Sequence, residues 1–273
     1  LGDRHEIYLV PCSGQRNITG MQTHEVWAVV NPSEQRVKDK TARRLLQIIG
    51  QVYRYAVITG RAKRNPATDL HGALKPRKTV HRAAITEPSK VAQLLRNCDN
   101  YDGYYPIVCA LRLAPLVFVR PTELRAAEWS EFNLEAHEWR IPATRMKMKQ
   151  MHIVPLSKQA VGILKELYLF SGSGKLLFPS IRTETRPLSD ATVLNALRRM
   201  GYGKDEMCTH GFRSIASTLL NELGYNRDWI ERQLAHGERN DVRSAYNYAE
   251  YLPQRTKMMQ EWADHLDKLK TER

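Results

Sequence analysis

Helical spacing of apolar residues runs through most of this 273-residue chain and gives way to a strand pattern in one short stretch. From Thr41 onward, apolar residues recur at intervals of three and four, which places them on one face of a helix. The segments Glu138–Ile141 and His152–Pro155 instead read as two short strands joined by a basic turn. We therefore predict a mainly α fold of the α+β class, in which a small antiparallel sheet interrupts the helices.

The first strong helix pattern begins near Thr41 and ends at Gly60, which suits the left-handed residue after a helix. Residues 1–35 show no clear period and no capped helix unit, so we leave them unassigned, as a disordered or replaced N-terminus. We expect the first 30 residues to be poorly ordered and the apolar face of the helix to lack some partners. That face consists of Leu45, Ile49, Val52 and Ala56.

The net charge of +13 is concentrated in one segment. Residues 36–82 carry 13 Lys and Arg residues against two Asp residues. Such a segment can be a solvated face, but at this density it favours a polyanion, and nucleic acid is the commonest such partner. We predict a partial DNA-clamping helical module with a basic linker at 36–82, and a second domain at 83–273. The expected DNA contacts in the module are Arg43, Arg44, Arg54, Arg61, Lys63, Arg64, Lys75, Arg77 and Lys78.

Membrane, secretory and metal-binding classes find no support in the sequence. The longest apolar run, Ile107–Val119, is interrupted by Arg112 and Pro115 and is shorter than the roughly 20 residues that cross a bilayer. No secretory leader opens the chain, so we expect a cytoplasmic protein. The cysteines lack the spacing of a zinc site, and we expect isolated reduced thiols, no metal and no cofactor. They are Cys12, Cys98, Cys109 and Cys208.

Two arginines stand at predicted helix starts in the second domain. Arg120 precedes Pro121, which fits the first helical position and leaves the guanidinium near exposed N–H groups that favour an anion. His210 and Arg213 lie three residues apart on the first turn of another helix, so both can converge on one oxyanion. Each also has an ordinary interpretation, as a surface arginine, a capping histidine or a solvated arginine.

Three further positions complete the candidate set. His236 ends a predicted helix, where a histidine is often a partner of the helix dipole. Tyr246 lies on a short predicted helix, where a tyrosine is often a core residue. Lys147 and Lys149 both lie in the basic turn between the two predicted strands.

Taken together, these residues resemble the catalytic signature of the tyrosine recombinases, the phage integrase family, and point to prophage integrases of enterobacterial type. The resemblance covers about residues 41–267, and we recognise nothing of the family before residue 40. The motifs that carry it are Arg120-Pro-Thr-Glu-Leu, Lys147 eight residues before Pro155, His210-Gly-Phe-Arg213, and Leu-Ala-His236 followed ten residues later by Tyr246.

The resemblance implies a DNA strand transferase that needs neither metal nor ATP and that integrates or excises a prophage. Tyr246 would attack the scissile phosphate and leave a 3′-phosphotyrosyl bond, which retains the energy of the ester for rejoining. Arg120 and Arg213 would make bidentate contacts with the charge that develops on the phosphate.

Proton transfer falls to the remaining residues of the signature. Lys147 would protonate the leaving 5′-oxygen, while His210 and His236 would bond the phosphate or take the tyrosine proton. Lys149 is the rival for Lys147 and is otherwise a DNA contact. The offset from Pro155 and the resemblance favour Lys147.

The resemblance also implies partners: double-stranded DNA attachment sites, a homotetramer on DNA, and DNA-bending or directionality proteins as accessory factors, with no membrane. A C-terminal apolar stripe can pack in cis as core or in trans on a neighbouring protomer. We favour exchange in trans, because recombinases of this family join four protomers by such a tail. The stripe consists of Met258, Met259, Trp262, Leu266 and Leu269.

Three other classes of protein stay open. A type IB topoisomerase-like enzyme would share the covalent step but relax supercoils. A DNA-binding regulator or remnant without catalysis would need only the basic segment. A metal-dependent nuclease would use His210, His236 and carboxylates, and activity that survives a chelator would exclude it.

Overall fold

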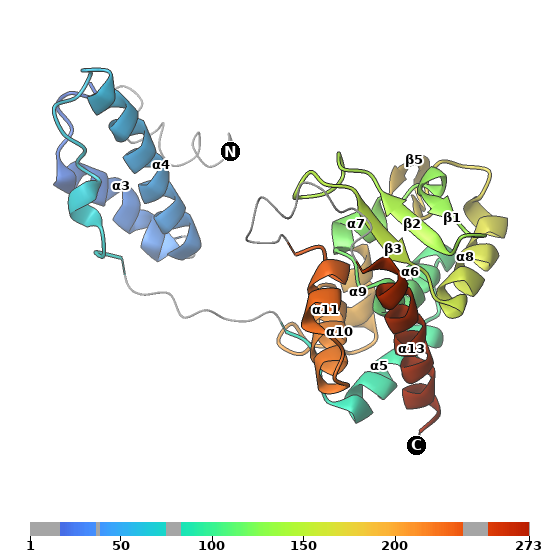
Figure 1. Cartoon of the computed structure of the whole chain (residues 1–273). Helices are drawn as coiled ribbons and strands as arrows, with labels where there is room; N and C mark the ends of the chain where they lie inside the picture. The colour runs from blue at the N-terminus through green and yellow to red at the C-terminus, as the bar shows by residue number, and fades with distance from the viewer. Residues whose placement is uncertain (1–16, 37–38, 75–82, 237–250, 273) are drawn as a thin grey trace. The chain divides into compact units, whose positions relative to one another are not determined.

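The protein divides into two compact units, Leu1–Val80 and His81–Arg273, each with a hydrophobic core of its own. The structure is a computed structural model that describes residues 17–36, 39–74, 83–236 and 251–272, with no side chains described for 32–40 (Figure 1). No helix in these ranges is long and apolar enough to span a membrane.

The first unit contains two packed helices, α3 (Thr23–Arg36) and α4 (Asp39–Ile58), followed by the 3-10 turn η2 (Thr68–Leu70). Val26 and Val30 of α3 are fully buried in the core that α3 shares with α4. The expectation that the first 30 residues lack order is therefore wrong for α3. Its two valines supply part of the covering that the apolar face of α4 needs.

The apolar face of α4 differs from the prediction at one position. Leu45, Ile49 and Ala56 are buried as predicted. Val52, however, is 47% exposed, and Tyr53 is buried in its place. Val52 and Tyr53 lie three and four residues after Ile49, so either side chain can reach this face of the helix. The aromatic ring of Tyr53 is the one that enters the core.

The second unit is built mainly of helices around a continuous apolar core (Figure 1). Helix α6 lies at its centre and contacts α5, α8, α9, α10 and α13. Its Leu111 and Leu113 are completely buried. The helices are α5 (Pro88–Asp99), α6 (Tyr105–Val117), α7 (Pro121–Arg125), η3 (Trp129–Glu131), α8 (Lys158–Ser171), α9 (Thr192–Arg199), α10 (Gly211–Glu222), α11 (Arg227–Gln233) and α13 (Leu252–Thr271).

Two small antiparallel sheets accompany these helices, in the orders β1-β2-β3 and β4-β5. In the larger sheet, Trp139 pairs with Val154 and Ile141 with His152. The residues on either side of the turn at 142–151, Ile141 and His152, are therefore paired and buried. The strands β2 and β3 have the bounds that the sequence predicts. The strands are β1 (Phe132–Asn133), β2 (Glu138–Ile141), β3 (His152–Pro155), β4 (Pro179–Ser180) and β5 (Thr183–Pro187).

The C-terminal helix α13 packs on its own unit, against α5, α6, α11 and β3 (Figure 1). Trp262 of α13 is fully buried, and its Nε1–H donates to the carbonyl of Pro115 at 2.9 Å. We expected the C-terminal stripe to pack in trans. It instead belongs to the core of this chain, because apolar surfaces of α5 and α6 meet it directly.

Candidate active site

Arg120 lies at the start of α7, as the sequence predicts, and its guanidinium is held by two acceptors. Nη1 donates to Glu123 Oε1 at 2.7 Å, and Nη2 donates to the carbonyl of Ala235 at 2.8 Å. Glu123 is 2% exposed, and its other oxygen accepts from the backbone N–H of Arg120 at 2.8 Å. One buried carboxylate thus fixes both the main chain and the side chain of Arg120.

Arg213 lies on the first turn of α10 and is buried. Nη1 donates to the carbonyl of Phe118 at 2.8 Å, and Nη2 donates to the carbonyl of Leu234 at 2.6 Å. Burial, followed by the positive charge of nearby Arg120, lowers the pKa of Arg213 to about 10. The guanidinium therefore remains charged at neutral pH, although it lies in the protein interior.

His236 follows α11 and is about half exposed. Its Nε2 lies 3.2 Å from Arg213 Nη2, and its Nδ1 lies 2.8 Å from Glu231 Oε2. An arginine nitrogen cannot accept a hydrogen bond, so Nε2 accepts and Nδ1–H donates to the carboxylate. Glu231 and Arg213 together select one tautomer and one orientation of the imidazole.

The turn Leu234–Ala235 at the end of α11 joins these side chains. Its two consecutive carbonyls accept from Arg213 and from Arg120. Ala235 has a φ of 48°, a left-handed conformation that is costly for a residue with a Cβ. The terminal carbonyls of a helix need partners outside it, and here two arginines supply them. We call this assembly of Arg120, Arg213, His236 and the Leu234–Ala235 turn the arginine site.

Of the other predicted catalytic residues, the structure describes His210, Lys147 and Lys149. His210 is half-buried and directly precedes α10, one helical turn before Arg213. Lys147 and Lys149 are exposed in the turn between β2 and β3. Tyr246 lies outside the described residues. Within the described ranges, no group of three or more His, Cys, Asp or Glu side chains is placed to hold a metal ion.

Gly211, between His210 and the rest of α10, packs closely against its neighbours. A Cβ at this position would lie 2.6 Å from Met207 Sδ and 3.0 Å from the carbonyl of Ala83. A larger residue would therefore displace the side chain of Met207 and crowd the carbonyl of Ala83. The glycine of the His210-Gly-Phe-Arg213 motif thus has a packing reason that the sequence alone does not give.

Sequence reasoning missed the ion pair that supports the turn at 142–151, which carries Lys147 and Lys149 and which we call the lysine turn. Arg145 forms an ion pair with Glu131, and its Nη2 donates to the carbonyl of Glu123 at 2.5 Å. Glu131 is buried, and its second oxygen accepts from Trp139 Nε1 at 2.9 Å. Arg145 thereby ties the base of the lysine turn to α7, the helix that Arg120 begins. The role of Glu123 had a signal, because it stands at the capping-box spacing after Arg120, but that of Glu131 had none.

The predicted DNA contacts of the first unit are mostly exposed. Arg54, Arg61, Lys63 and Arg64 are exposed, whereas Arg43 and Arg44 on α4 are half-buried. The other predicted contacts of this module, Lys75, Arg77 and Lys78, lie outside the described residues.

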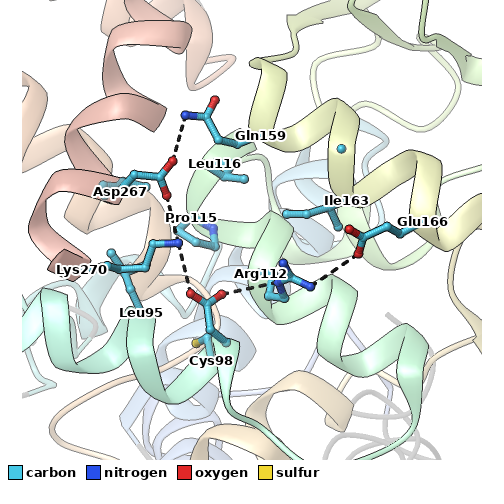
Figure 2. Close-up of a pocket in the computed structure, with 13 residues that line it drawn as sticks. Leu95, Cys98, Arg112, Pro115, Leu116, Gln159, Ile163, Glu166, Asp267 and Lys270 are labelled. Atoms are coloured by element: carbon cyan, nitrogen blue, oxygen red, sulfur yellow. Dashed lines mark hydrogen bonds and ion pairs between the residues drawn. The ribbon is translucent and has the colours of Figure 1, made fainter.

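A second charged cluster lines a cavity of about 210 Å³ between α5, α6, α8 and α13 (Figure 2). Lys270 bonds Asp99 at 3.1 Å and Asp267 at 3.0 Å. Arg112 lies 3.4 Å from Asp99 and 3.7 Å from Glu166. Each cation in this charged cavity therefore has two carboxylates beside it, and the cluster joins α13 to the rest of the unit.

Both units of the chain match models of known protein families. Residues 85–252 match the model of the phage integrase family, and residues 2–73 match the model of the phage integrase central domain. The second match covers residues that we left unassigned, so the similarity begins well before Thr41.

One curated relative and two solved structures illustrate the likeness. The integrase of Enterobacteria phage P4 is 42% identical over 96% of this chain, which spans 63% of the length of that protein. A crystal structure of a lambda integrase (75–356) dimer bound to a COC′ core site has a TM-score of 0.68, at 18% identity over 85% of each chain. A lambda integrase tetramer bound to a Holliday junction has a TM-score of 0.64, at 19% identity over 82% of this chain and 66% of that one. At these identities the structural likeness concerns the fold.

Proposed function

This chain belongs to the phage integrase family, and we propose that it is a tyrosine-type site-specific recombinase that cleaves and rejoins DNA in prophage integration or excision. The reaction passes through a 3′-phosphotyrosyl intermediate on Tyr246 and takes place on DNA in the cytoplasm. The observation that carries this proposal is the convergence of Arg120 and Arg213 on the Leu234–Ala235 turn, beside His236.

The two arginines suit the phosphate in the transition state. Arg213 is preorganised by carbonyls and keeps its charge in a buried place, so it needs little rearrangement when negative charge develops. Arg120 is held by Glu123 and retains 18% exposure, which leaves it accessible from the surface. A preorganised donor of this kind contributes about 3 kcal/mol to transition-state stabilisation.

Proton transfer uses groups around the arginine site. Lys147, on its exposed turn, protonates the leaving 5′-oxygen, with Lys149 as the rival residue. His236 has its Nε2 beside Arg213, and this nitrogen is a hydrogen-bond acceptor, so it is placed to take the proton of the attacking tyrosine. His210 bonds the phosphate from the start of α10 or takes the proton of the attacking tyrosine.

The covalent step explains why neither ATP nor a metal is needed. When Tyr246 attacks, the P–O bond to the 5′-oxygen breaks and a tyrosyl ester of similar energy forms, so a new 5′-hydroxyl can reverse the step. The arginines supply the charge stabilisation that a metal ion provides in other phosphoryl-transfer sites.

DNA attachment sites are the proposed substrate, and the basic residues of the first unit are the proposed clamp on their phosphates. Assembly as a homotetramer on DNA is part of the proposal, and the fold likeness to a lambda integrase tetramer on a Holliday junction supports it. DNA-bending or directionality proteins are the proposed accessory partners.

A nicked suicide duplex tests the proposal, because cleavage releases a short strand and traps the covalent complex. We expect an adduct on a denaturing gel in the presence of chelator and without ATP, and transfer of the strand to the 5′-hydroxyl of a second duplex. Tyr246→Phe should abolish the adduct, whereas the matched variants Tyr248→Phe and Tyr251→Phe should retain it.

Other outcomes assign other functions. An adduct that Tyr251→Phe abolishes and Tyr246→Phe retains would identify a different nucleophile. DNA binding without any adduct would indicate a non-catalytic remnant. Relaxation of supercoils without transfer between duplexes would indicate a topoisomerase-like enzyme.

A further inference from the structure

Arg255, on the first turns of α13, is a fully buried cation that connects three elements. Its Nη2 donates to the carbonyl of Ile153 in β3 at 2.5 Å. Nε and Nη2 also donate to Gln233 Oε1 at the end of α11, at 3.1 and 2.7 Å. One side chain thus holds the C-terminal helix, the strand after the lysine turn, and the helix that leads to His236.

Gln233 is the link between Arg255 and the arginine site. It is completely buried and directly precedes the Leu234–Ala235 turn. Its carbonyl accepts a hydrogen bond from His152 Nε2, in β3, at 3.1 Å. The residue before the turn is therefore fixed through its side chain by Arg255 and through its backbone by His152.

The burial of the Arg255 charge is unfavourable for the free energy of folding. Among the described residues, the hydrogen bonds of Arg255 go to neutral oxygens and none goes to a carboxylate. Arg255 Nη1 and Gln233 Nε2 are buried, and within the described ranges they have no hydrogen-bond partner. A buried charge without a counter-ion carries a desolvation penalty, and apolar replacements of buried ionic groups are often neutral or stabilising.

We propose that Arg255 is a positioning residue for strand cleavage. It fixes Gln233 and β3 so that the carbonyls of Leu234 and Ala235 hold Arg213 and Arg120 in the geometry that the phosphate requires. The cleavage readout rests on the proposed function, whereas the structural effect on the two histidines does not. Because a misplacement of 1 Å costs roughly 100-fold in rate, loss of Arg255 affects chemistry far more than DNA affinity.

The test compares Arg255→Met, which keeps the length of the side chain, with Arg255→Lys and with a control variant on the same helix. We expect Arg255→Met to lower the single-turnover cleavage rate at saturating duplex by tenfold or more, with less than a twofold change in Kd. Arg255→Lys can still donate to Gln233 and Ile153, and it should restore part of the rate. Lys270→Met, which removes cavity ion pairs of α13, should cleave at the wild-type rate per folded molecule.

A second readout uses DNA-free protein and long-range ¹H–¹⁵N correlations of the histidine rings. The geometry gives His152 as the Nε2–H tautomer and His236 as the Nδ1–H tautomer. Arg255→Met should change the ¹⁵N shifts of both rings, and Lys270→Met should change neither. Wild-type shifts in Arg255→Met would overturn the proposal, and so would a wild-type cleavage rate. If the wild-type chain itself does not cleave DNA, the proposed function fails, and the ring shifts still decide whether Arg255 positions the turn.

Discussion

The arginine site and the charged cavity both hold cations at the edge of the same helical core, but they differ in how those cations are paired. The arginine site pairs Arg120 with the carboxylate of Glu123, whereas the hydrogen bonds given for Arg213 go to neutral acceptors. In the cavity, Lys270 and Arg112 each lie beside two carboxylates. In the arginine site, the hydrogen bonds of Arg213 go to two carbonyls and an imidazole nitrogen, all neutral acceptors.

From this difference we infer that the cavity is a structural charge cluster and that the arginine site binds the phosphate of the proposed substrate. Although burial opposes the charge of Lys270, hydrogen bonds to Asp267 and Asp99 raise its pKa, so the cavity stabilises its own cations. In the arginine site, burial and the charge of Arg120 lower the pKa of Arg213. A phosphate would relieve that repulsion, whereas it would compete with carboxylates in the cavity. The cavity lies between four helices, but the chemistry that we propose uses the arginine site.

The largest expected effect comes from removing either arginine. Arg120→Ala and Arg213→Ala should each lower the cleavage rate by roughly 100-fold or more, because each removes a preorganised transition-state donor. Single-turnover cleavage of the suicide duplex at saturating protein measures the effect. Arg112→Met in the cavity is the matched control and should retain the wild-type rate. A loss confined to Kd would make the two arginines ordinary backbone contacts and would remove the distinction between the two regions.

Lys147→Ala should lower cleavage by roughly 100-fold on a normal duplex, which is typical for loss of a general acid. A duplex with sulfur in place of the leaving 5′-oxygen should restore most of the rate, because a thiolate leaves without a proton. Lys149→Ala is the neighbouring control and should show no such rescue. Rescue of Lys149→Ala alone would transfer the role to that residue.

The stability of the second unit should fall as the pH drops, because of His152 beside the arginine site. Burial, followed by the charges of Arg255 and Arg232, lowers the pKa of His152 well below its usual value. The unfolded chain therefore binds the proton first, near pH 6.5, and the free energy of unfolding decreases below that pH by up to about 1.4 kcal/mol per unit. Denaturant unfolding at pH 7.5 and 5.5 measures the slope.

His152→Gln should flatten this pH dependence, because the amide can still donate to the carbonyl of Gln233 but does not titrate. His265→Gln is the control variant. Burial also lowers the pKa of His265, but its ring is only partly enclosed, so this replacement should change the slope less than His152→Gln does. An unchanged slope in His152→Gln would show that burial and the nearby charges of Arg255 and Arg232 do not lower the pKa of His152 in the folded chain.

The smallest expected effect lies in the cavity. Asp99→Asn removes a shared partner of Lys270 and Arg112, whose side chains are about a third exposed. We expect a loss of about 1 kcal/mol in the free energy of unfolding, reduced at high salt. Cleavage per folded molecule should stay at the wild-type rate. A loss of cleavage would mean that the docking of α13 through the cavity also controls the chemistry.

Local pattern predicted much of this fold. The strands β2 and β3 and the position of Arg120 before Pro121 depend on neighbours in sequence, and they were predicted correctly. Helix α3 was missed because residues 1–35 show no clear helical period, although burial of Val26 and Val30 on α4 stabilises the helix. Tertiary packing likewise decided between Val52 and Tyr53.

Of the predicted catalytic residues, Arg120, Arg213 and His236 meet in the structure, but the geometry that joins them was not predictable from the sequence. Its arginines bind main-chain carbonyls of Phe118, Leu234 and Ala235, and main-chain acceptors leave no mark in the side-chain pattern. Arg255 was missed because an arginine on an amphipathic helix is ordinarily interpreted as a solvated residue. One of its acceptors, the carbonyl of Ile153, is also a main-chain group.

The most direct test of the central claim replaces one non-bridging oxygen of the scissile phosphate by a methyl group, which removes the negative charge from that phosphate. If Arg120 and Arg213 act by stabilising that charge, the neutral methylphosphonate should need them less. The 100-fold deficits of Arg120→Ala and Arg213→Ala should then shrink to within about tenfold of the wild-type chain on the same duplex. An undiminished deficit on the neutral duplex would contradict the account, because the arginines would then serve cleavage by some means other than phosphate charge.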